Sequence, residues 1–386
     1  ITSAGFRDTL EIARENRYDL YDIFLEMPQP LAPRRLRQEV GERLDHTGAV
    51  LTPLDTDDAE RAVKQLIAEN VQAIAVIFLH SFRNPAHELA MRDIIQRLAP
   101  SVAVSLSVEV MPELREYDRT STTVANAYTQ PIMERYVNRL IDNLRQLGFA
   151  GRLFVMLSSG GITTPETASR YPVRVLESGP AAGAIAAAHY ARQLDLRHVI
   201  SFDMGGTTAK TCLVKDGKPH TTTDFEVAKV YRFKKGSGLP IKLPVIEMIE
   251  IGAGGGSIAH IDAMGLLKVG PESSGSDPGP ACYCIGGTQP TVTDADLVLG
   301  YLDPRFFLGG EMSLDAGAAR AAIEEHVAKP LGIDLVRAAW GIHQIVNENM
   351  ANASRMHAVE QGEDPKAYSM VAFGGAGPVH AYGVAQ

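Results

Sequence analysis

The stretch VISFDMGGTTAKTCLVKDG, residues 199–217, consists of two apolar runs separated by a short polar loop. The runs are typical of neighbouring β-strands, and the loop DMGGTT is short enough to close a tight hairpin. Gly205 and Gly206 are predicted to adopt backbone angles that other residues avoid. Because glycines carry no side chains, their N–H groups can approach an anion closely, so the loop is suited to bind phosphate oxygens.

The side chains beside these glycines fit the same chemistry. Thr207 and Thr208 add hydroxyl donors. The carboxylate of Asp203 would repel a phosphate directly, so we expect it to hold Mg²⁺ or to orient an attacking group. From the residues alone, the alternative is an ordinary glycine hairpin with a surface aspartate.

A second glycine loop lies near the end of the chain, in MVAFGGAGPVHA, residues 370–381. Gly374, Gly375 and Gly377 follow a strand-like run, and Pro378 is a favoured first residue of a helix. Such a loop can lie flat against a base or ribose, and a helix that begins there directs free N–H groups at a ligand. A close-packed strand–helix turn is the alternative. Together the two loops indicate two sides of one nucleotide cleft.

Composition bounds the function classes. The chain has 386 residues, too long for one ordinary domain, and a net charge of −9. Without a long basic run, nucleic acid and anionic membranes are poor partners, and no apolar run reaches membrane-spanning length. Three cysteines make no disulfide framework, and a reducing cytoplasm is expected. The chain starts at Ile1, which we interpret as a chain already in progress.

The pattern along the chain predicts an α/β protein. Residues 1–110 alternate strand-like and helical segments, and 130–149 form an amphipathic helix pattern ending near Gly148. Residues 224–300, including the glycine-rich stretch 232–240, lack periodicity and are predicted to be irregular functional loops. From about residue 313 helical patterns dominate.

The stretch 251–262, IGAGGGSIAHID, offers further chemistry. Its glycines could bind a phosphate or substrate, or could let two lobes meet closely. His260 and Asp262, with Asp294 and Asp296 of TVTDADL, have side chains suited to a metal ion. Capping and turn roles for the aspartates are the alternative.

Three more features are ambiguous from the sequence. Cys282 and Cys284 could bind zinc, but no second ligand pair stands at the usual spacing, so buried or incidental thiols are expected. His343 and His357 are expected to be packed or solvated. Lys210 could contact a phosphate, pair with an acid, or face solvent.

Several blocks, in this order, resemble the A subunit of the hydantoinase/oxoprolinase family over nearly the whole chain. The clearest are ESGPAAG (177–183), FDMGGTT (202–208), VGPESSGSDPGPACY (269–283) and FGGAGPVHA (373–381). So many ordered motifs are far more specific than one glycine loop.

The resemblance implies an α/β fold of the actin/Hsp70/sugar-kinase type, with two ribonuclease-H-like lobes and ATP between them. Residues 203–208 then match the second phosphate loop, and 373–378, which contain Gly374, Gly375, Ala376, Gly377 and Pro378, match the adenosine loop. The first phosphate loop, Asp-x-Gly-Gly-Thr, is absent, so under a hundred residues are expected before Ile1. Residues 1–112 would be a partial N-terminal domain and 113–386 the hydantoinase A domain.

The resemblance also implies a function. We expect ATP-dependent opening of a cyclic amide, such as a hydantoin, 5-oxoproline or a lactam, through phosphorylation of the amide oxygen. ATP, Mg²⁺ and a B-type partner subunit or domain would take part in a hetero-oligomer. The alternatives are a subunit of an ATP-dependent ketone carboxylase and a non-catalytic nucleotide-binding module.

Overall fold

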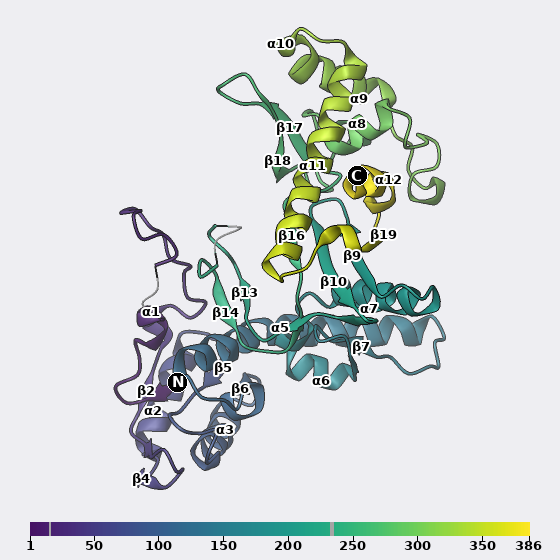
Figure 1. Ribbon diagram of the computed structural model, residues 1–386. Helices are drawn as coiled ribbons and strands as arrows, with labels where there is room; N and C mark the ends of the chain where they lie inside the picture. Colours follow the sequence, from purple (N-terminus) through teal and green to yellow (C-terminus); the bar gives the residue numbers. More distant parts are fainter. Residues whose placement is uncertain (15–16, 232–234) are drawn as a thin grey trace. The chain divides into compact units, whose positions relative to one another are not determined.

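The computed structural model describes residues 1–14, 17–231 and 235–386, so part of the predicted loop 232–240 lies outside the described residues. The described chain divides into two compact units (Figure 1). Unit 1 comprises Ile1–Ala181 and Thr221–Val245, and unit 2 comprises Ala182–His220 and Ile246–Gln386. Each unit mixes helices and strands, which confirms the predicted α/β class.

Unit 1 contains short strands and larger helices. Its strands are β1 (Thr2–Ser3), β2 (Glu39–Val40), β3 (Arg43–Leu44), β4 (Val50–Thr52), β5 (Ala73–Val76), β6 (Ala103–Leu106), β7 (Val155–Met156), β8 (Ile162–Thr163), β12 (Thr221–Thr222), β13 (Phe225–Val227) and β14 (Leu239–Ile241). Its helices are α1 (Thr9–Ile12), α2 (Thr56–Ala68), α3 (Ala86–Leu98), α4 (Ser107–Val110), α5 (Glu116–Gln146) and α6 (Pro165–Arg170). Strand β15 (Val245–Ile246) pairs with β12 and begins at the last residue of unit 1.

The strand–helix–strand rhythm predicted for the first 110 residues is confirmed in β5, α3 and β6. β5 and β6 pair in parallel, with Ala73 opposite Ala103. Helix α2 begins where the side chain of Asp55 accepts a hydrogen bond from the N–H of Asp58, a typical N-cap. Val63 and Leu66 recur at helical spacing, so they lie on one face of α2. This face is buried against β5, β6 and α3.

Helix α5 begins earlier than the sequence pattern predicts. The pattern placed a helix at 130–149, but α5 starts at Glu116 and continues through Pro131. The first half has no apolar period because buried polar side chains occupy its inner face. Arg119 donates to the carbonyl of Phe78, and Asn126 donates to Ser105. These buried polar groups form hydrogen bonds inside the unit, which apolar periodicity cannot predict.

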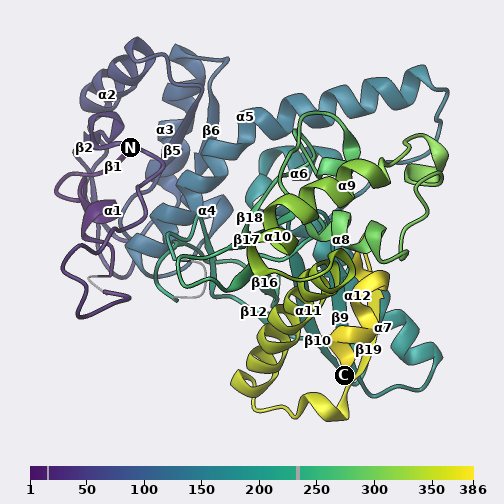
Figure 2. The same ribbon diagram turned by 90° about the horizontal axis from the view of Figure 1, so that it is seen from above.

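Unit 2 is built on one sheet in the order β11-β10-β9-β19, with β16 also paired to β10 (Figures 1 and 2). Its strands are β9 (His198–Met204), β10 (Ala209–Lys215), β11 (Lys218–Pro219), β16 (Ile249–Ile251), β17 (Ser257–Ile261), β18 (Leu267–Ser273) and β19 (Ser369–Phe373). Its helices are α8 (Val292–Val298), α9 (Ala316–Ile323), α10 (Lys329–Leu331), α11 (Leu335–Glu360) and α12 (Gly377–Ala385), while α7 (Ser178–Gln193) begins in the last residues of unit 1.

The predicted irregular region 224–300 contains regular structure. β17 and β18 form an antiparallel hairpin, and β16 joins the main sheet beside β10. The prediction was wrong for β17 and β18, because these short strands lie between glycine-rich turns and show no clear alternation. The helical patterns after residue 313 are confirmed in α9 and α11.

The main core of unit 2 lies between its sheet and helix α11. Phe202 and Met204 of β9 are fully buried together with Ile342, Val346 and Met350 of α11. Each such side chain contributes about 1.5–3 kcal/mol when transferred from water. This packing fixes the end of β9, where the DMGGTT loop begins.

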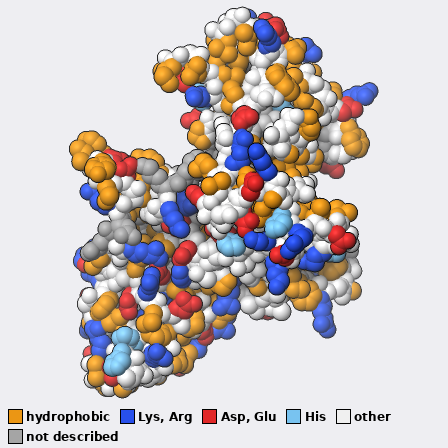
Figure 3. Space-filling view, in the orientation of Figure 1, with side chains coloured by type: hydrophobic (Ala, Val, Ile, Leu, Met, Phe, Trp, Pro, Cys, Tyr) orange, Lys and Arg blue, Asp and Glu red, His pale blue; other side chains and the backbone are white. Residues whose placement is uncertain are grey.

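Large hydrophobic side chains are exposed on the segment of unit 1 that follows α1. Leu20, Tyr21, Ile23 and Phe24 are each at least 72% exposed, and hydrophobic atoms gather there at the upper left of Figure 3. Contiguous exposed apolar groups of this kind are typical of surfaces that contact other molecules. None of the described helices combines the length and hydropathy needed to cross a bilayer.

Candidate functional site

The two glycine loops lie side by side in unit 2. β9 and β19 are parallel neighbours, with Phe373 directly opposite Asp203. The N–H of Ala376 donates to the carbonyl of Met204 across 2.9 Å. The loops therefore leave the carboxyl ends of adjacent parallel strands, the edge where α/β sheets bind ligands.

Gly374 is required by this close approach. Its φ of +84° lies in the left-handed region, and a methyl group there would overlap Oδ1 of Asp203 and lie 2.5 Å from the carbonyl oxygen of Met204. A side chain would cost both backbone strain and steric displacement. The glycine thus allows the second loop to contact the end of β9.

The DMGGTT segment forms the predicted hairpin, closed by a hydrogen bond from the N–H of Gly205 to the carbonyl of Thr208. The prediction of unusual backbone angles was wrong, because neither Gly205 nor Gly206 has a positive φ. Instead, a Cβ at Gly205, Gly206 or Gly375 would meet no atom of the chain within 4 Å. Thr207 is exposed beside them. These backbone positions face open space that a ligand can approach.

A third glycine segment packs behind the hairpin. Gly255 and Gly256 donate N–H groups to the carbonyls of Gly205 and Gly206 at 3.0 and 2.6 Å. A Cβ at Gly254 would lie 2.6 Å from the backbone of Gly206. This close backbone approach lies within unit 2, so it joins two loops of one unit.

The electrostatics of Asp203 favour a cation. Burial raises the pKa of the half-buried Asp203, while the charge of Lys210 opposes that rise. Lys210 stands opposite Asp203 on β10 and pairs with Glu250 at 3.9 Å, one of the roles the sequence left open. A carboxylate penalised by burial gains when a positive charge approaches.

The metal group suggested by His260, Asp262, Asp294 and Asp296 does not form. Asp294 makes the capping box of α8 with Thr291, and Asp262 accepts backbone N–H bonds inside a turn. The alternative roles in caps and turns are confirmed for these two aspartates.

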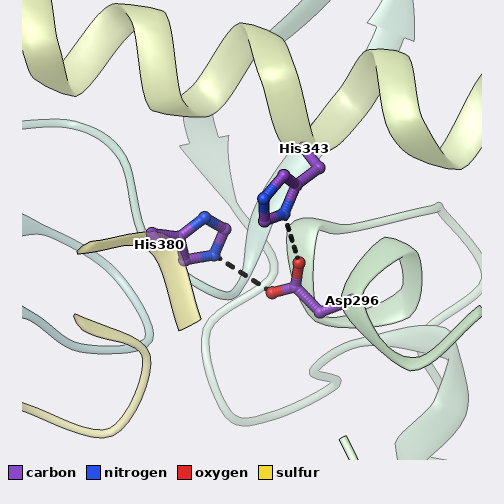
Figure 4. Close-up of side chains that lie close together, drawn as sticks. All are labelled: Asp296, His343 and His380. Atoms are coloured by element: carbon purple, nitrogen blue, oxygen red, sulfur yellow. Dashed lines mark hydrogen bonds and ion pairs between the residues drawn. The ribbon is translucent and has the colours of Figure 1, made fainter. Parts of the chain in front are cut away.

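Asp296 lies instead between two histidines (Figure 4). Its carboxylate contacts Nδ1 of His343 at 2.8 Å and Nε2 of His380 at 3.0 Å. Nδ1 of His380 lies 2.7 Å from Oδ1 of Asn347. Burial alone would raise the pKa of Asp296, but the two imidazoles hold it below its ordinary value.

Sequence reasoning missed this cluster. His343 is packed, as expected, but against Asp296, and His380 was not singled out although it follows the second glycine loop directly. Its place in GPVHA, at the start of a helix beside glycines, was the available signal. His343 and His380 lie 47 and 84 residues from Asp296 in the sequence, so residue spacing could not predict that the three meet.

Among the described residues, Cys282 and Cys284 belong to no cluster of possible metal ligands. Cys282 is buried and Cys284 is exposed, and both are free thiols. Burial raises the pKa of both thiols, so neither is a ready thiolate. The expectation of buried or incidental thiols is confirmed.

These features define a mixed α/β protein with paired glycine loops at the carboxyl edge of its sheet. The sequence model described as hydantoinase/oxoprolinase matches residues 119–386, and that of the hydantoinase/oxoprolinase N-terminal region matches residues 1–99. The chain belongs to the hydantoinase/oxoprolinase family, which confirms the resemblance of its motifs.

Particular relatives are similar over almost the whole chain. The caprolactamase subunit alpha of Pseudomonas jessenii is 38% identical over 99% of this chain and 54% of its own length. The acetophenone carboxylase gamma subunit of Aromatoleum aromaticum is 39% identical over 92% of this chain and 48% of its own length. The chain thus spans about half the length of these curated relatives.

Solved structures agree with this assignment. The nucleotide-free structure of acetone carboxylase matches all of this chain and 55% of its own, with a TM-score of 0.84 and 28% identity. The ATP-dependent caprolactamase from Pseudomonas jessenii matches with a TM-score of 0.77 and 38% identity, over 100% of this chain and 55% of that chain.

Proposed function

We propose that this chain carries phosphate- and adenosine-binding loops of an ATP-dependent enzyme that opens a cyclic amide. One observation carries the proposal: Asp203 and Gly374 are in contact at the carboxyl ends of two adjacent parallel strands. The names of the caprolactamase and of relatives called 5-oxoprolinase support the choice of a cyclic amide.

In this proposal, each of the two loops binds a different part of the nucleotide. The hairpin binds the phosphates, and the second loop binds the adenosine, because its glycines let the backbone lie flat against the base or ribose. The open space around the glycines supports this assignment. The proposed phosphate residues are Gly205, Gly206, Thr207 and Thr208, and the proposed adenosine residues are Gly374, Gly375, Ala376, Gly377 and Pro378.

Asp203 fits the role of a magnesium ligand. It is a half-buried carboxylate beside open backbone, and Mg²⁺ prefers one or two carboxylates plus waters and phosphate oxygens. When bound, the ion would neutralise charge on the transferred phosphoryl group. Asp203 itself would hold the ion or orient the attacking group.

The chemistry addresses the poor reactivity of an amide. The amide oxygen attacks the γ-phosphorus, the bond to the bridging oxygen breaks, and ADP leaves. Water adds to the activated carbon, the C–N bond breaks as nitrogen takes a proton, and a second water hydrolyses the resulting acyl phosphate. The protein positions the phosphates and stabilises the developing charge.

The proposal also covers the type of fold, the domain boundary and a partner subunit. The order β11-β10-β9-β19, antiparallel among its first three strands and parallel at the last pair, supports a ribonuclease-H-like lobe of the actin/Hsp70/sugar-kinase type. We propose a boundary near residue 112 between N-terminal and hydantoinase A domains, and a B-type partner that completes hydrolysis. Relatives named as subunits support the partner.

A second function has its own support. The TM-score of 0.84 with acetone carboxylase favours phosphorylation of a ketone enolate, followed by carboxylation with activated bicarbonate. The loops would serve the same purpose in both reactions, because each begins with transfer of the γ-phosphoryl group to a carbonyl oxygen.

A substrate panel separates these functions. We would measure phosphate release from ATP by the full-length protein that contains this chain, with and without its partner subunit. Stimulation by 5-oxoproline, a hydantoin or a lactam supports ring opening, and stimulation by a ketone with bicarbonate supports carboxylation. If the complete complex binds ATP and no substrate stimulates release, the chain is a non-catalytic module and the proposal fails.

A further inference from the structure

We propose that Asp296, His343 and His380 form a buried binding site for a divalent transition-metal ion of the zinc class. The three side chains come from helices α8, α11 and α12, and their ligand atoms all lie within 4.8 Å of one another. This site shares no residue with the Asp203 loop, and the proposal does not depend on the proposed reaction.

The hydrogen-bond chain leaves a place for a cation. Oδ1 of Asn347 faces Nδ1 of His380, so Nδ1 donates its proton to the amide. Nε2 of His380 then faces the carboxylate of Asp296, 3.0 Å away. Two electron-rich atoms facing each other in a buried site repel unless a proton or a metal ion lies with them.

The arrangement around His380 is typical of metal ligands. A metal-binding imidazole usually donates its other N–H to a carbonyl or carboxylate, which fixes its tautomer. Asn347 supplies that carbonyl here. In the part of the chain that the structure describes, Asp296 pairs with the two imidazoles and with no lysine or arginine.

The ligand set selects the class of ion. Two imidazoles and one carboxylate suit Zn²⁺ and similar first-row ions, whereas Mg²⁺ and Ca²⁺ prefer oxygen ligands. Bonds to such an ion are about 2.0–2.2 Å long, so all three ligand atoms must gather around one point. Metal binding would displace the protons that now join these groups.

The three ligand side chains are buried. Asp296, His343 and His380 are 2%, 4% and 0% exposed, and the rings of Tyr301 and Trp340 stack against His343. Three protein ligands leave the fourth position of such an ion to a water molecule. The bound ion would fasten α12, and with it the second glycine loop, to α8 and α11.

Metal analysis of the purified full-length protein tests the proposal. After dialysis, we expect about one equivalent of bound zinc-class metal per chain, and a lowered melting temperature when a strong chelator is added. His343→Gln and His380→Gln should lose the metal. His357→Gln is the matched control, because His357 is also buried on α11 but lies outside the cluster.

Asn347→Leu gives a test that keeps all three ligands. Loss of its carbonyl should weaken metal affinity about 10–100-fold without abolishing binding. Wild-type protein that remains metal-free after zinc titration overturns the proposal, whatever the variants do. Retention of full metal occupancy by both glutamine variants overturns it as well.

Discussion

Gly374 contacts Asp203 so closely that a single added methyl group would overlap the carboxylate oxygen Oδ1. The two residues lie far apart in the sequence, yet the parallel pairing of β9 and β19 places them at one edge of the sheet. The contact sets the distance between the two glycine loops. The predictions below test that distance and the chemistry proposed for it.

Gly374→Ala should destabilise unit 2, and Gly375→Ala should not. Gly374 has a φ of +84° and no room for Cβ, whereas a Cβ at Gly375 meets nothing within 4 Å. We expect a loss of about 1–3 kcal/mol in the free energy of unfolding for the first variant, and a change within about 0.5 kcal/mol for the second. Urea unfolding of both proteins measures this, and equal stability of the two would contradict the described contact.

Asp203→Asn should abolish ATP turnover while leaving the fold intact or slightly more stable. Burial raises the pKa of Asp203, so the ionised carboxylate is unfavourable in the folded protein near neutral pH, and a neutral amide removes that penalty. Loss of the proposed magnesium ligand should lower the rate about 100-fold or more. Phosphate release and melting temperature are measured together.

Asp216→Asn is the control for this variant. Asp216 directly follows strand β10, at the end that lies away from Asp203. Its ion pair with Arg197 is exposed. Its loss should change neither rate nor stability much, because surface pairs contribute little. Normal turnover by Asp203→Asn would remove that residue from the catalytic proposal.

Gly254→Ala and Gly205→Ala should separate stability from binding. A Cβ at Gly254 would lie 2.6 Å from the backbone of Gly206, so the hairpin must shift, and we expect destabilisation of about 1–3 kcal/mol. A Cβ at Gly205 meets nothing in the chain, so stability should hold while affinity for a fluorescent ATP analogue falls. Unchanged affinity for the analogue in Gly205→Ala would argue against phosphate contact at this glycine.

The ion pairs of Glu109 predict a pH dependence in unit 1. Arg92 and Arg170 contact its carboxylate at 2.7 and 2.8 Å. Burial alone would raise the pKa of Glu109, but these hydrogen bonds and charges outweigh it and lower the pKa below its ordinary 4.5. The stabilisation is therefore complete above pH 4.5 and is lost as pH falls through the lower, folded-state value.

Glu109→Gln should accordingly be less stable than wild type near neutral pH, by up to about 1 kcal/mol because the group is partly exposed. The difference should shrink as the pH falls below 4.5 and through the lowered pKa of the folded state, where the wild-type carboxylate also becomes protonated. Asp142→Asn, which removes the exposed pair with Arg145, is the control. A stability gap that stays constant across this range would exclude the assigned ion pairs as its source.

Much of the fold follows from local sequence patterns. The hairpin of β9 and β10 and the strand, loop and helix at 369–385 were predicted, because turn glycines and apolar runs act over a few residues. The first half of α5 and the strands β17 and β18 were missed. There, buried hydrogen bonds and pairing with distant strands determine the structure, and these leave no period in the sequence.

The candidate site divides in the same way. The sequence by itself determined the family, the two glycine loops and the acidic residue at the first of them. Only the tertiary structure decided that Asp203 contacts Gly374, and that Asp296 pairs with His343 and His380 rather than with His260. The physical reason is that strand order and helix packing bring such partners together, while local spacing depends only on neighbours along the chain.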